Sequence, residues 1–119
     1  MLNLGKRWKV LMVYIYAISF LLSGFAVAGP LHDAAKEGDL VTIKSLIAEG
    51  FDVNTVDNNE MTPLHLAAQI GCKEIAEILI LKGANVNAKT KSGITPLHSA
   101  VREGHKEVED LLTKHGGYE

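Results

Sequence analysis

The 119-residue chain contains a single cysteine, Cys72, and only three prolines. One cysteine excludes an intramolecular disulfide, so a fold of this size must be held together by packing. Basic residues are also scarce after residue 28, where nine Lys and Arg stand against 14 Asp and Glu. Because binding to nucleic acid or to an anionic membrane surface requires clustered cations, this deficit argues against both partners.

Charged residues are absent from positions 10–31, directly after three basic residues among the first nine. An apolar stretch over 10–22 and small residues at 26–28 complete the pattern of a signal peptide. We expect residues 1–28 to be cleaved after Ala28, and the remaining domain to be periplasmic or secreted in a bacterium. The uncharged run is also long enough to cross a bilayer, so an uncleaved membrane anchor is the alternative.

The three prolines lie 33 residues apart, and each begins the triplet Pro-Leu-His. The same period relates further positions, namely Ala34, Ala67 and Ala100; Gly38, Gly71 and Gly104; Leu46, Leu79 and Leu112; and Gly50, Gly83 and Gly116. A fixed period of this length indicates stacked supersecondary units, none of which can bury its apolar face alone. Three such units are about the smallest number that is stable.

The middle copy predicts how one unit folds. Thr62 before Pro63 indicates a helix start, because a hydroxyl caps the first turn and the N–H that proline lacks is not needed there. We expect a first helix over 63–70, ended by Gly71, and a second helix over 73–82. Asn, Ser and Gly then mark a projecting, finger-like turn before the next unit. Each unit is therefore two antiparallel helices and a finger.

The repeated motifs are Thr62, Pro63, Leu64 and His65; Thr95, Pro96, Leu97 and His98; and the run Gly-Ala-Asn-Val-Asn-Ala at 83–88. In motif and period the chain resembles ankyrin repeats over residues 29–119. The resemblance implies an all-α solenoid of three helix-turn-helix units, at about 29–56, 57–89 and 90–119. It also implies a concave groove, formed by the fingers and the first helices, that binds another protein.

Departures from the repeat suit the ends of a stack. The first copy has Gly29 in place of threonine, and Thr42 and Ser45 where the middle copy has isoleucines, so we expect a polar outer face there. In the middle copy Glu60 occupies the finger position that Gly93 holds in the third. Because glutamate is strained at positive φ, we expect this finger to adopt a different turn.

The polar residues form no recognisable catalytic or metal constellation. Equivalent histidines on stacked helices lie about 8–10 Å apart, whereas zinc needs its nitrogen ligands at about 2 Å. His32, His65 and His98 are therefore expected to be structural, and the resemblance implies bonds to the threonine cap and neighbouring backbone. His105 and His115 are expected at the surface near helix ends. No Gly-flanked nucleophile or phosphate loop is present, so we expect neither cofactor nor enzymatic activity.

A partner would contact groove side chains that the core does not require. These are Asn58, Asn59, Met61, Lys91, Ser92 and Ile94 on the fingers, and Lys36, Glu37, Gln69, Ile70, Arg102 and Glu103 on the first helices. Met61, Ile70 and Ile94 are apolar where the fold needs nothing apolar, which often marks protein contact. We expect a monomer that binds one other protein. Two alternatives remain open, a membrane-tethered scaffold that keeps residues 1–28 and a redox- or metal-responsive protein that uses Cys72.

Overall fold

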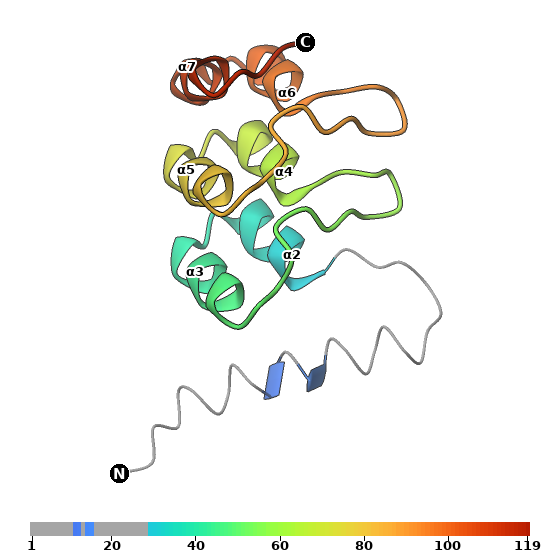
Figure 1. Cartoon of the computed structure of the whole chain (residues 1–119), viewed down its shortest axis with the longest axis vertical. Coiled ribbons are helices and arrows are strands. Elements are labelled where there is room, and N and C mark those ends of the chain that lie inside the picture. Colours follow the sequence, from blue (N-terminus) through green and yellow to red (C-terminus); the bar gives the residue numbers. More distant parts are fainter. Residues whose placement is uncertain (1–10, 13, 16–28) are drawn as a thin grey trace.

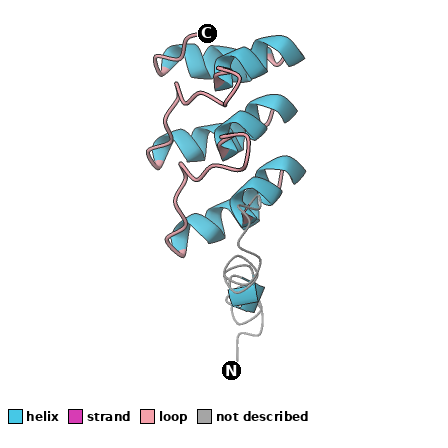
Figure 2. Ribbon diagram, turned by 90° about the vertical axis from the view of Figure 1, so that its right-hand side faces the viewer, coloured by secondary structure: helices cyan, strands magenta, loops and turns pink. Residues whose placement is uncertain are grey.

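The computed structural model describes residues 11–12, 14–15 and 29–119. Within residues 29–119, six helices form three pairs, α2 (Pro30–Glu37) with α3 (Leu40–Ala48), α4 (Pro63–Ile70) with α5 (Lys73–Leu81), and α6 (Pro96–Glu103) with α7 (Lys106–Lys114). The pairs are stacked one above another, with the first helices in one layer and the second helices in the other (Figures 1 and 2). Over these residues no strand is present, and the all-α prediction is confirmed.

The predicted leader, its cleavage site and the alternative anchor fall almost entirely outside the described residues. Within the described part of the chain, no helix combines the length and the apolar character needed to span a bilayer. Cleavage after Ala28 therefore stays a prediction.

Each first helix begins and ends as the repeat predicts. The hydroxyl of Thr62 accepts a hydrogen bond from the backbone N–H of His65, and Thr95 does the same for His98. Proline follows each cap, where its fixed φ suits the first turn. Gly71 then ends α4 in the left-handed region, at φ 76°. The predicted bounds of α4 are confirmed, and α5 ends one residue earlier than expected.

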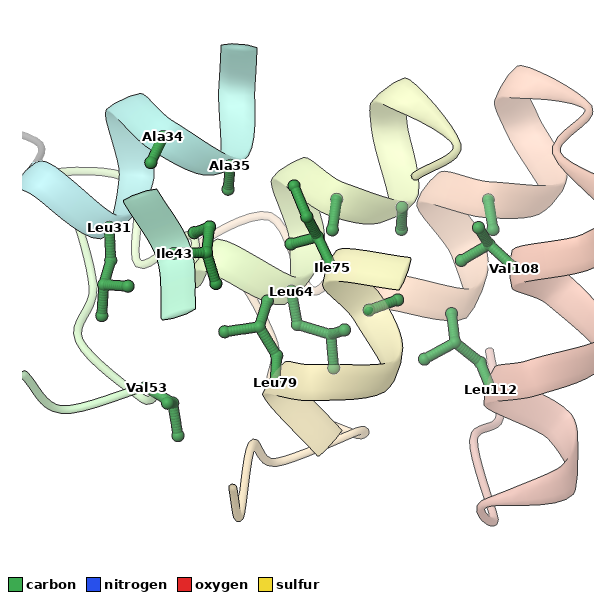
Figure 3. Close-up of a cluster of buried hydrophobic side chains, with 14 of the residues drawn as sticks. Leu31, Ala34, Ala35, Ile43, Val53, Leu64, Ile75, Leu79, Val108 and Leu112 are labelled. Carbon is green, nitrogen blue, oxygen red and sulfur yellow. The ribbon is translucent and has the colours of Figure 1, made fainter. Parts of the chain in front are cut away.

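The core runs without a break through all three units (Figure 3). Helix α4 packs against α2 on one side and α6 on the other. Buried alanines let these first helices approach closely, and buried leucines fill the space beside the second helices. The repeated members are Ala34, Ala67 and Ala100, and Leu46, Leu79 and Leu112. A unit thus buries its apolar stripe mainly against its neighbours.

Two asparagines tie successive units together, a role that the sequence analysis did not identify. The side-chain amide of Asn54 donates to the carbonyl of Gly83 (3.0 Å), and its carbonyl accepts from the N–H of Asn85 (2.7 Å). One unit along, Asn87 bonds in the same way to Gly116 (3.1 Å) and Tyr118 (3.0 Å). An amide side chain carries both a donor and an acceptor, so asparagine can satisfy both backbone groups at once.

The fingers are residues 57–61 and 90–94, and both adopt the same type of turn. In the first finger Glu60 has φ 60°, and its N–H donates to the carbonyl of Asp57. Gly93 has φ 78° and makes the equivalent bond to Thr90. The expectation of a different turn was wrong, because glutamate adopts the left-handed conformation despite its steric cost of roughly 1–2 kcal/mol.

The second helix of the first unit, α3, has a side-chain N-cap that α5 of the middle unit lacks. Thr42, which was expected to face water, is half-buried, and its hydroxyl donates to the Asp39 carboxylate at the start of α3 (2.5 Å). The neighbouring Ile43 is fully buried. Its equivalent in the middle unit, Ala76, is fully buried as well, so the first unit keeps this buried position while Thr42 reinforces the N-cap.

Candidate functional site

A cleft of about 320 Å³ opens between the two fingers and helices α4 and α6. Its lining consists of Asn59, Met61, Gln69, Thr90, Lys91, Ser92, Ile94, Ser99, Arg102 and Glu103. The structure therefore brings most of the predicted groove residues to one place. Thr90 and Ser99 also line the cleft, and the sequence analysis did not identify them, because their types carry no signal in a repeat whose core is built from Ala and Leu.

Lys36, Glu37, Asn58 and Ile70 do not line the cleft, although all four are exposed. Lys36 and Glu37 lie on α2, one unit before Gln69 and Ile70. The Ile70 side chain, 40% exposed, reaches across to the first unit, where its Cδ1 would lie 3.6 Å from a Cβ placed on Gly38. Part of the apolar character of Ile70 is therefore explained by packing between units.

Hydrogen bonds fix the fingers that wall the cleft. One carboxylate oxygen of Asp57 accepts from the backbone N–H groups of Asn59 and Met61, both at 2.9 Å. In the second finger the hydroxyl of Thr90 accepts from the N–H of Ile94 (3.1 Å). The N–H of Lys91 donates to the carbonyl of Asn59 (3.0 Å), which joins the two fingers. The walls of the cleft are thus ordered before any partner arrives, which lowers the entropic cost of binding.

The repeated histidines hold each finger to the helix layer of the preceding unit. His32 Nε2 lies 2.7 Å from the carbonyl oxygen of Met61, and His65 Nε2 lies 2.8 Å from that of Ile94. His65 Nδ1 accepts from the backbone N–H of Thr62 (3.1 Å), so the neutral ring must carry its proton on Nε2 and donate it to Ile94. Burial lowers the pKa of His65 below its usual value of 6.5, which favours this neutral form.

The structural role predicted for the histidines therefore differs along the stack. His65 makes the full set of bonds to threonine and backbone. His32 lacks the threonine, and its Nδ1 is buried without a hydrogen-bond partner. The imidazole of His98 is exposed, because no finger follows the third unit within the described residues, and its backbone N–H alone bonds to Thr95 (3.2 Å).

The sequence predicted only that His105 lies at the surface near a helix end. In the structure its ring contacts the end of α4 in the preceding unit. Its Nε2 lies 2.8 Å from the carbonyl oxygen of Gln69, at the end of α4. The ring covers Gly71, where an added Cβ would lie only 2.4 Å from Nδ1. His105 therefore packs at the junction between the second and third units, next to the cleft.

Cys72 precedes α5 and is half-buried, with its sulfur 3.8 Å from a carboxylate oxygen of Glu74. In the part of the chain that the structure describes, no three His, Cys, Asp or Glu side chains are grouped as metal ligands.

A family model for ankyrin repeats matches residues 31–119 in three copies. Ankyrin repeats are generally protein–protein interaction modules, and the family is typically non-enzymatic. No match to a curated protein was found.

Proposed function

We propose that this chain, which belongs to the ankyrin-repeat family, is a small, exported, non-enzymatic module that binds another protein through the cleft and the adjoining groove. The convergence of the predicted groove residues on one cleft carries this proposal. Two fingers braced by backbone hydrogen bonds form its walls, and the half-buried side chains of Met61 and Ile94 supply apolar area. Such a combination of apolar contacts inside a polar rim is typical of binding surfaces.

The size of the domain limits the interface. Three units offer a short groove, so the area buried on binding should lie at the small end of specific interfaces, below about 1,200 Å². A few well-placed side chains must then supply most of the binding free energy. We expect the module to act as a monomer.

The binding proposal is tested by affinity capture from the compartment in which the protein resides. Wild type, the groove variant Ile70→Glu/Ile94→Glu and the control variant Val41→Glu/Leu81→Glu are compared by quantitative mass spectrometry. Val41 and Leu81 are exposed on the second helices, away from the cleft. A partner recovered with wild type and the control but lost with the groove variant supports the proposal. Equal recovery with both variants contradicts it, provided that circular dichroism shows all three proteins folded.

Export rests on the leader pattern of residues 1–28 and is tested separately. The mass of the natural protein should correspond to a chain that begins at Gly29. An intact N-terminus in the membrane fraction would instead support the tethered scaffold.

A further inference from the structure

The residue at the bottom of the cleft is small and polar, whereas the equivalent residue of the middle unit is large and apolar. Ser99 occupies the position at which the middle unit has Leu66, so a hydroxymethyl group replaces a larger apolar side chain. Only 3% of Ser99 is exposed, yet it lines the cleft. Its hydroxyl forms no hydrogen bond to another described residue. Among the described residues, His32 Nδ1 is the one buried side-chain polar atom without a partner, so the Ser99 hydroxyl is open to the cleft, where a ligand can reach it.

Two cations stand at the rim of the same cleft. Lys91 lies on the second finger and Arg102 on the last turn of α6. Neither forms an ion pair with a described residue, whereas Lys73 and Lys106 on the second helices do. Glu103 is the one acidic side chain in the lining. The lining therefore carries one more positive than negative side chain, on a domain in which acidic residues outnumber basic ones.

The donors and the walls together define the chemistry of the ligand. The arginine guanidinium has a planar pair of donors that fits a carboxylate, and lysine and serine add further donors. Met61 and Ile94 provide an apolar wall beside them. The volume is at the lower end of the roughly 300–1,000 Å³ found for small-ligand pockets. It suits one or two side chains of a partner.

We infer that the cleft binds an aspartate or glutamate side chain that stands next to an apolar residue in an extended segment of the partner protein. The carboxylate lies between Arg102 and Lys91 and accepts a hydrogen bond from Ser99, and the apolar neighbour packs on Met61 and Ile94. This inference rests on the proposed function and specifies which segment of a partner the groove recognises.

A displayed library of random, unmodified peptides tests the specificity directly. Selection is carried out on wild type, on Lys91→Glu/Arg102→Glu and on the control Lys82→Glu/Lys114→Glu, which changes the net charge equally but outside the cleft. We expect wild type and the control to enrich peptides with Asp or Glu beside an apolar residue. The cleft variant should lose that enrichment and favour basic peptides. The same preference in both variants would mean that the cleft does not determine it.

The role of Ser99 is tested with one selected peptide by fluorescence anisotropy. Ser99→Leu restores the residue type of the middle unit, so the fold should tolerate it while the cleft is filled. We expect Ser99→Leu to abolish binding, and replacement of the peptide's Glu by Gln to weaken it about tenfold, as the loss of charge-assisted hydrogen bonds does. Ser99→Ala, which keeps the space, should weaken binding less than Ser99→Leu.

The outcomes separate the two proposals. Selected peptides without acidic residues, or wild-type affinity in Ser99→Leu, overturn the inference and leave protein binding intact. If wild type selects no peptide at all and captures no partner, both the inference and the proposed function fall.

Discussion

The middle and third units contain the same tetrapeptide, Thr-Pro-Leu-His, and use it differently. In both, threonine caps a helix and proline follows it. His65 is then fully buried and bonded to the next finger, whereas the ring of His98 is exposed. The local conformation comes from the motif itself, but burial comes from the unit stacked on top. In a solenoid, the role of a repeated residue therefore depends on the neighbouring unit.

The largest difference in stability between the middle and third units is expected at the helix contact. Ala68 is fully buried between the first helices, and its counterpart Val101 is 43% exposed. Ala68→Glu should cost at least about 3 kcal/mol, because it leaves an uncompensated charge in the core. Val101→Glu should cost less than about 1 kcal/mol, as exposed substitutions do. Urea unfolding followed by circular dichroism measures both, with Ala68→Ser as the control for a polar but uncharged change. Similar losses for both glutamates would show that the third unit is covered in solution.

A smaller difference is expected at the glycines that end the first helices. Gly71 and Gly104 have nearly the same φ, 76° and 75°, so alanine at either position costs about 1 kcal/mol of backbone strain. At Gly71 the new Cβ would also collide with the His105 ring, whereas nothing lies within 4 Å at Gly104. Gly71→Ala should therefore lose roughly 1 kcal/mol more than Gly104→Ala, because the ring must leave its carbonyl partner. Thermal unfolding of the two variants tests this, and His105→Ala should remove the difference.

The smallest expected effect is a pH dependence of stability that comes from His65 and not from His98. Burial lowers the pKa of His65 in the folded state below 6.5. The unfolded chain then takes up a proton at a higher pH than the folded one, so stability present above pH 6.5 is lost as the pH falls through the folded pKa. We expect the free energy of unfolding to decrease from pH 7 to pH 5. His65→Gln should flatten this slope, and His98→Gln should leave it in place. An unchanged slope in His65→Gln would assign it to other groups.

The repeat period predicted most of the fold because it combines three independent local signals in register. Thr62 before Pro63 marked a helix start, Gly71 marked its end, and alanines marked the face of close helix contact. Each signal acts within a few residues, so sequence alone reports it well. Glu60 shows the limit of such reasoning, because the finger bonds of Asp57 hold a strained residue in a turn that its side chain does not favour.

The candidate site was predicted less completely. Met61 and Ile94 stood out because they are apolar at finger positions, but Ile70, chosen on the same ground, packs partly on the first unit. Ser99 gave no signal at all. Its importance comes from a comparison with Leu66 in the layer below and from the space between two fingers, and neither is visible in a single stretch of sequence.

The helices, their caps and the order of the units follow from the sequence alone, because they depend on hydrogen bonds and conformational preferences within a few residues. The stacking of the units determines which histidine is buried, where His105 lies and that Ser99 lines the cleft beside Lys91 and Arg102, two residues that the repeat had already placed on the groove. The physical reason is that burial and electrostatic environment are set by atoms of the neighbouring unit, about 30 residues away in the chain.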